Sequence, residues 1–154
     1  MTLQSVRTFL SERAPDIEIL EKPTSTATVL EAAQAHGVKP AQIAKTLSLK
    51  LKDEVILLVI GGDAKIDNRK YKDQFGGKAT MLTADEVLHW TGHPIGGVCP
   101  FGLPQKLRIF ADTTLKKFDV VIPAAGATNA ALRISPERLV ELVGAQWVDV
   151  AQGA

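Results

Sequence analysis

The sequence predicts an α+β fold in which a mixed, largely antiparallel sheet is surrounded by helices. Segments with strand character dominate the middle of the chain, and short turns join neighbouring ones, which favours pairing as hairpins. A doubly wound parallel sheet would instead require a helix between successive strands. A length of 154 residues suits a single hydrophobic core. We therefore expect one domain over residues 1–154.

The first part of the chain predicts two helices and a short strand. Apolar residues at helical spacing predict an amphipathic helix over residues 2–13, and an edge strand is expected near residues 17–19. Thr28 and Glu31 have the spacing of a capping box, which predicts a helix over residues 29–36. A glycine follows this helix, and a proline then opens a short helical turn.

Leucines alternate with polar residues over residues 45–51, which is typical of a half-buried strand. A turn over residues 52–54 then leads into a buried strand, Val55–Ile60. The remaining elements that we expect are a helix over 68–75 capped by Asp67, a helix over 84–90 with a Thr83–Glu86 capping box, strands over 107–111, 118–122, 130–134 and 147–150, a short turn capped by Asp112 or Thr113, and a helix that follows Ser135 and ends at Gly144.

Composition excludes several classes of protein. The formal net charge is +1, so nucleic-acid binding would need a local basic patch rather than an overall positive charge. One cysteine permits no disulfide within the chain, which favours a reducing, cytoplasmic setting. The first residues lack the apolar region of a signal peptide, and the longest apolar run, Val55–Ile60, is too short to span a membrane. No phosphate-binding or dinucleotide-binding glycine motif is present, and we expect no cofactor.

Four glycines and two prolines fall within residues 91–102. Glycine permits a positive φ and a close approach to the main chain, whereas proline stiffens its neighbours. A loop of this kind can hold several N–H groups at a fixed angle, which suits an ester carbonyl that gains negative charge under attack. The alternative is a tight connection between a helix and a strand.

Two sets of basic residues are site candidates. Lys45 lies on the leucine side of its strand, and because burying an ammonium group is costly, a lysine on a buried face indicates a site. Alternatively, it lies at the strand's start and extends to water. Lys65, Arg69 and Lys72 share a helical face that could bind a phosphate backbone, or could be an ordinary solvated face.

Conventional catalytic groups are difficult to assemble from this sequence. Cys99 has His89 and His93 nearby, which raises a Cys–His hydrolase or a zinc site, but no orienting third group and no second ligand cluster follow. We expect no metal. The inward Lys45, the loop and a second glycine turn at Gly126 instead fit hydrolysis by positioned water with charge stabilisation.

Several segments, taken in order, resemble the YbaK/prolyl-tRNA-editing family of free-standing aminoacyl-tRNA deacylases. These segments are Ser25-Thr26, Glu31-Ala32-Ala33, Gln42 to Leu47, Gly62-Asp63, Thr91-Gly92, Gly96 to Gly102, Asp112 and Ala125-Gly126-Ala127. The resemblance implies a sheet curled into a partial barrel, and hydrolysis of the ester between a wrong amino acid and the terminal adenosine of a tRNA.

The resemblance also implies roles for individual residues. The family's essential lysine falls on Lys45, and its G-x-x-x-P loop falls on Gly96 to Pro100. The second glycine turn, usually Gly-Gly, is Gly126-Ala127 here, and the position that is often serine is Cys99. The expected catalytic groups are Lys45, Gly96 and Gly97; the expected substrate-binding residues are Thr26, Thr46, Val98, Cys99, Pro100, Phe101, Asp112 and Gly126; the expected tRNA-binding residues are Lys65, Arg69 and Lys72.

The leading hypothesis is thus a trans-editing deacylase whose partner is the acceptor end of a tRNA, with an aminoacyl-tRNA synthetase as a further possible partner. The amino acid would be alanine, cysteine, serine or threonine, on tRNA-Pro or tRNA-Cys. Two alternatives stay open: a non-catalytic module that binds tRNA or a synthetase, and a hydrolase of small aminoacyl esters unrelated to tRNA.

Overall fold

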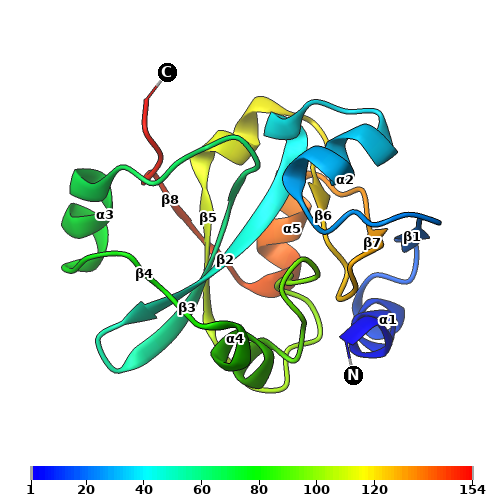
Figure 1. Ribbon diagram of the computed structural model, residues 1–154, viewed down its shortest axis with the longest axis horizontal. Coiled ribbons are helices and arrows are strands. Elements are labelled where there is room, and N and C mark those ends of the chain that lie inside the picture. Colours follow the sequence, from blue (N-terminus) through cyan, green and yellow to red (C-terminus); the bar gives the residue numbers. More distant parts are fainter. Residues whose placement is uncertain (1, 154) are drawn as a thin grey trace.

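The computed structural model describes residues 2–153, and within them a six-stranded sheet has the strand order β4-β2-β3-β5-β8, with β6 beside β2. Figure 1 shows this sheet across the middle of the molecule, with α3 at one end and α1 and α2 at the other. The strands are β1 (Leu20–Glu21), β2 (Ile43–Leu51), β3 (Glu54–Gly61), β4 (Thr80–Met81), β5 (Arg108–Asp112), β6 (Ile122–Pro123), β7 (Ala130–Ala131) and β8 (Gln146–Val148).

The sheet is mixed, as expected, but antiparallel pairing does not dominate it. Among the described residues, β2 pairs antiparallel with β3 and β4, whereas the pairs β3–β5, β5–β8 and β2–β6 are parallel. Only β2 and β3 form the expected hairpin within this sheet. Longer connections lead to β5, β6 and β8, and such connections allow a strand to run parallel to its partner. The sheet curls only partly, and these strands do not close into a barrel.

The central strand β3 is buried on both faces, as its continuous apolar run predicts. Leu57 and Val59 pack into a cluster with residues of α1 (Thr2–Arg13) and α5 (Pro136–Val143). Ile56, Leu58 and Ile60 face the opposite side, where Tyr71 of α3 (Asn68–Phe75) covers them. The period-two alternation of a strand thus places one core on each side of the sheet.

Helix ends follow the caps that the sequence predicts. Thr28 and Glu31 close a capping box on α2 (Val29–His36), and Thr83 and Glu86 close another on α4 (Ala84–Thr91). These reciprocal hydrogen bonds satisfy backbone N–H groups that a helix start leaves without partners. Asp67 caps α3, Ser135 caps α5, Asp112 caps the 3-10 helix η2 (Thr113–Lys117), and a second 3-10 helix, η1 (Pro40–Gln42), precedes β2.

Strand boundaries in the second half differ from the predictions. The strand expected over 118–122 is reduced to β6, which pairs parallel with β2. The strand expected over 130–134 is reduced to β7, whose ladder partner is β1, although isolated bridges Val121–Ile134 and Ala124–Ala131 retain part of the expected hairpin. Pro123 has no N–H to donate, which limits how far a ladder can continue through it. None of the described helices is long and apolar enough to cross a membrane.

Candidate active site

A gap along one edge of β2 defines the site. One side of β2 pairs with β3 along its length, but the other side pairs with β6 only at Ile43 and Ala44 and with β4 only at Leu49 and Lys50. The four residues between these ladders therefore have no neighbouring strand on that side. A break of this kind leaves space beside the sheet for another molecule.

A cavity of about 250 Å³ lies against this gap. It is smaller than the ~300–1,000 Å³ pockets that usually hold drug-sized ligands, so it suits a small group. Met81 and Ile95 lie at its edge and are 58% and 61% exposed. The lining comes from the segment before α2, from α2, β2, β4, α4, the glycine-rich loop, β6 and β7: Thr26, Ala27, Thr28, Val29, Ala32, Ile43, Ala44, Lys45, Thr46, Leu47, Ser48, Met81, Leu82, Val87, Ile95, Gly96, Val98, Ile122, Ala124, Ala130 and Ala131.

Lys45 lines this cavity and is half-buried. Its Nζ donates a hydrogen bond of 2.8 Å to the carbonyl oxygen of Ala64, in the turn that follows β3. Burial lowers the pKa of Lys45; the Asp63 carboxylate opposes that shift and the Lys65 ammonium adds to it. The amine is thus held at the cavity wall by one neutral acceptor and forms no ion pair among the described residues, which is how lysines at binding sites are often placed.

The glycine-rich loop reaches the cavity at Ile95, Gly96 and Val98. Gly96 has φ 89°, and a Cβ there would lie 2.7 Å from Cβ of Ala27, so the loop backbone packs directly against the segment before α2. Among residues 2–153, the N–H groups of Gly96 and Val98 have no hydrogen-bond acceptor. The Gly97 N–H instead donates to Pro94 O at 2.9 Å, and Gly97 O accepts from Gly126 N–H at 3.0 Å. The available donors are therefore Gly96 and Val98 rather than Gly96 and Gly97.

Cys99 and His93 lie next to each other, but they are sealed inside the core. The Cys99 Sγ lies 3.6 Å from Nε2 of His93, and both side chains are 0% exposed. The same Nε2 lies 2.8 Å from Phe101 O, and because a carbonyl can only accept, Nε2 carries the proton. That nitrogen cannot take a proton from the thiol. Burial also raises the pKa of Cys99 to about 12 and lowers the pKa of His93, so the pair stays neutral.

The other predicted substrate-binding residues beyond the cavity wall have structural partners. Phe101 is fully buried and packs against Phe9 at a centroid distance of 6.0 Å. Asp112 is also fully buried, and its carboxylate accepts from Val150 N–H at 2.7 Å and Thr114 N–H at 2.9 Å. Gly126, with φ 88°, donates its N–H to Gly97 O and so connects its turn to the glycine-rich loop. Of the predicted site residues, the cavity lining includes Lys45, Gly96, Thr26, Thr46 and Val98, and does not include Gly97, Cys99, Pro100, Phe101, Asp112 and Gly126.

The model of a family described as an aminoacyl-tRNA editing domain matches residues 23–142. This chain belongs to that family. The match spans every segment that lines the cavity, from Thr26 to Ala131, and it confirms the resemblance drawn from the sequence.

Individual relatives support the same assignment. Uncharacterized protein YwhH of Bacillus subtilis (strain 168) is 46% identical over 154 residues, which cover 99% of this chain and 98% of that protein. A solved structure described as a candidate trans-editing enzyme for prolyl tRNA synthetase matches with TM-score 0.90 and 34% identity, over 98% of this chain and 97% of that one. The proline–tRNA ligase of Kosmotoga olearia is 36% identical over 115 residues, but this editing domain spans only 20% of its length.

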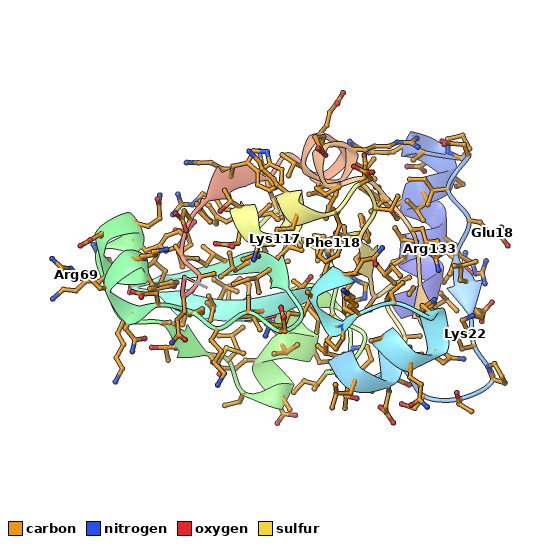
Figure 2. All side chains as sticks on the ribbon, turned by 90° about the horizontal axis from the view of Figure 1, so that it is seen from above. Glu18, Lys22, Arg69, Lys117, Phe118 and Arg133 are labelled. Atoms are coloured by element: carbon orange, nitrogen blue, oxygen red, sulfur yellow. The ribbon has the colours of Figure 1, made fainter. Side chains whose placement is uncertain are left out.

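The basic face predicted for tRNA lies outside the cavity lining of this editing domain. Lys65, Arg69 and Lys72 are exposed and form no ion pair among the described residues. Figure 2 shows Arg69 pointing outward from α3 at one end of the molecule, and Lys22 and Arg133 at the other end. Lys65 influences the pKa of Lys45, so this residue connects the basic face to the cavity.

Sequence reasoning missed most of the cavity wall, including Ser48, Ala27 and the apolar residues of α2 and α4. Ser48 belongs to the polar side of an alternating strand, which suggests exposure, but it is only 3% exposed. The alternation was the available indication, but it could not show that the polar side faces a cavity rather than water. Among residues 2–153, no group of His, Cys, Asp or Glu side chains could hold a metal ion.

Proposed function

We propose that this protein is a free-standing trans-editing deacylase. It would hydrolyse the ester that joins a small, wrongly attached amino acid to the terminal adenosine of a tRNA, with tRNA-Pro and tRNA-Cys as the expected carriers. The observation that carries the proposal is the convergence on one small cavity of a half-buried lysine and a stiff loop with two unpartnered N–H groups. Membership of the aminoacyl-tRNA editing family supports it.

The proposed chemistry needs no protein nucleophile. The acyl carbonyl would accept hydrogen bonds from the Gly96 and Val98 N–H groups, which stabilise the negative charge that develops on its oxygen. Water, or a neighbouring hydroxyl of the ribose followed by water, would attack the carbonyl carbon. The bond between that carbon and the ribose oxygen breaks, the ribose oxygen takes a proton, and a free amino acid and an uncharged tRNA are released.

Lys45 would hold the terminal nucleotide through its phosphate or ribose, or orient the attacking water. Its hydrogen bond to a single carbonyl leaves two of its three N–H donors available. The size of the cavity would exclude a larger, correct amino acid, as a second sieve does in editing. Positioning and charge stabilisation together would supply the rate enhancement.

The direct test is release of amino acid from mischarged tRNA by the wild type and by Lys45→Ala. We expect kcat/KM to fall by at least about 100-fold, which matches loss of a positioned charge contact of about 3 kcal/mol. Lys117→Ala, which removes an exposed lysine outside the cavity, is the matched control and should behave as the wild type. Equal rates for the wild type and Lys45→Ala would remove this lysine from the mechanism.

The basic face of α3 favours tRNA over a small ester, and it keeps open a second candidate, a non-catalytic module that binds tRNA. The double charge reversal Arg69→Glu and Lys72→Glu should weaken tRNA binding about tenfold at low salt and less at high salt, because phosphate contacts depend on ionic strength. Binding by the wild type without ester hydrolysis on any small amino acid would favour the module. Hydrolysis that is insensitive both to salt and to the charge reversal would favour a small aminoacyl ester.

A further inference from the structure

Two large apolar side chains lie at the opening of the cavity. Among residues 2–153, the large apolar side chains that are more than half exposed are Leu30, Met81, Leu88 and Ile95. Of these, Met81 and Ile95 also line the cavity, and a side chain that does both lies at the cavity mouth. Scattered exposed apolar residues are normal on a protein surface, but a pair that shares the mouth of one cavity indicates a contact surface.

The cavity is too small for the whole reacting end of a charged tRNA. Its volume of about 250 Å³ lies below the ~300–1,000 Å³ of pockets that hold drug-sized ligands, and an aminoacylated adenosine is a ligand of that size. The proposed chemistry places the acyl carbonyl at the N–H groups of Gly96 and Val98, so the aminoacyl group occupies the cavity. The base of the terminal adenosine therefore stays outside, at the mouth.

The base cannot lie far from this mouth, because it is attached to the same ribose ring that carries the ester. Ile95 directly precedes Gly96, whose N–H group is a proposed donor to the ester carbonyl. Met81 comes from β4, the short strand that pairs with Leu49 and Lys50 and so bounds the gap along β2. One side chain of the glycine-rich loop and one of β4 thus border the place that the base would occupy.

We infer that Met81 and Ile95 hold the base of the terminal adenosine by packing against its faces. This inference rests on the proposed deacylase function. A nucleobase has apolar faces, and enzymes that bind an unpaired base hold it between aromatic or apolar side chains. The methionine thioether also makes favourable contacts with aromatic rings. Because every tRNA ends in the same adenosine, contacts that do not read the edge of the base are sufficient.

The extent of this surface favours a base over a protein partner. A stable protein–protein interface buries roughly 800 Å² on each partner, which takes about 20–30 residues a side. The mouth instead offers two exposed apolar side chains, since the other two exposed ones, Leu30 and Leu88, do not line the cavity. A pair of side chains matches the size of one flat ring system.

The test compares two non-hydrolysable 3′-amide analogues with the same alanyl group, one on adenosine and one on a ribose that lacks the base. We expect the wild type to bind the adenosine analogue at least about tenfold more tightly, as stacking of a single base allows. Met81→Ser and Ile95→Ser should each reduce this ratio several-fold. Leu88→Ser, which removes a similarly exposed apolar side chain outside the cavity lining, is the matched control and should leave it unchanged. A wild-type ratio near one, or a ratio that neither substitution at the mouth changes, would overturn the inference and leave this surface to another occupant, such as a synthetase.

Hydrolysis of the matching alanyl esters separates this inference from the proposed function. Both substitutions replace exposed side chains, so both variants should fold, and the wild-type comparison needs no substitution. On the adenosine ester, kcat/KM of each variant should fall several-fold, whereas on the ester without a base it should equal that of the wild type. If no ester is hydrolysed but the adenosine analogue still binds more tightly through Met81 and Ile95, the proposed catalysis fails and the base recognition survives. If the wild type hydrolyses both esters with the same kcat/KM, the base recognition fails and the catalysis survives.

Discussion

Two clusters of chemically capable side chains lie in this molecule, and they differ in what surrounds them. His93 and Cys99 form a close pair, 3.6 Å from sulfur to nitrogen, inside the core with no exposed surface. Lys45, Thr46 and Ser48 lie on the stretch of β2 that pairs with β3 on one side and has no neighbouring strand on the other, at a cavity. The first cluster resembles a catalytic pair in composition, whereas the cavity beside the second is lined by no His, Cys, Asp or Glu side chain that could activate a hydroxyl.

The difference teaches that access and hydrogen-bond satisfaction identify a site better than residue type does. His93 Nε2 already donates to Phe101 O, and burial keeps the Cys99 thiol protonated. In the second cluster the lysine is only half-buried, and the Thr46 Oγ1 has no hydrogen-bond partner in the described residues. Groups left incomplete at a cavity are those that a substrate can complete.

The largest expected difference between the two clusters is in thiol reactivity. Cys99 should react with a thiol reagent at least about 100-fold more slowly than a cysteine introduced by Lys45→Cys on a Cys99→Ala background, because only the latter lies at the cavity. The measurement is the labelling rate of each folded protein at pH 8. Equal rates in denaturant are the control, and equally fast labelling in the folded state would break the comparison.

The next largest effect should come from the loop. Gly96→Ala places a Cβ 2.7 Å from Ala27 at φ 89°, so we expect a loss of about 1–3 kcal/mol in the free energy of unfolding and a deacylation rate at least about tenfold lower. Gly76→Ala is the matched control, because Gly76 also has a positive φ of 76° but no atom within 4 Å of the added Cβ. Denaturant unfolding and ester hydrolysis measure both effects. Equal rates for the two variants would contradict a role for the loop geometry.

A substitution at Asp112 tests whether this buried carboxylate, which lies outside the cavity, has a purely structural role. Asp112→Asn replaces one of two acceptors with an NH₂ group that faces an N–H, either that of Val150 or that of Thr114, so stability should fall by about 1–3 kcal/mol. The folded variant should keep its ester hydrolysis rate within about twofold, because Asp112 does not line the cavity. A large rate loss without a stability loss would return Asp112 to the site.

The smallest expected effect is a displacement of the pH profile. If the Lys45 ammonium is the active form, deacylation is lost as pH rises through its pKa, and burial places that loss at a lower pH than for an ordinary lysine. The Asp63 carboxylate raises this pKa, so Asp63→Asn should move the alkaline limb to still lower pH. The readout is kcat/KM against pH for both proteins. A limb that stays in place, or moves upward, would contradict the electrostatic assignment.

Local patterns predicted the helices well and the sheet less well. Both capping boxes, the Asp67 and Ser135 caps and the limits of α2 and α3 follow from neighbouring residues, because capping is a local interaction. The strands expected over 118–122 and 130–134 were predicted too long and as a hairpin, because pairing partners such as β1 for β7 lie far away in sequence. Periodicity carries no information about a partner 100 residues away.

The candidate site also has features that local sequence patterns predict and features that they do not. The inward position of Lys45 follows from its parity with the leucines of β2, and the stiffness of the loop follows from its glycines and prolines. The choice of Gly96 and Val98 over Gly97 as donors depends on a turn within the loop, in which Gly97 N–H donates to Pro94 O, whereas the bond from Gly126 N–H to Gly97 O forms only when the two glycine turns pack together.

The sequence by itself determined the helices, their caps, the buried hairpin of β2 and β3 and the family, because these depend on short-range spacing and on an ordered set of motifs. Only the tertiary structure decided that Cys99 is sealed, that Asp112 also accepts a hydrogen bond from the distant Val150 N–H and that Ser48 lines the cavity. Burial and hydrogen-bond satisfaction are properties of the packed chain, since each depends on segments that meet only when the protein folds.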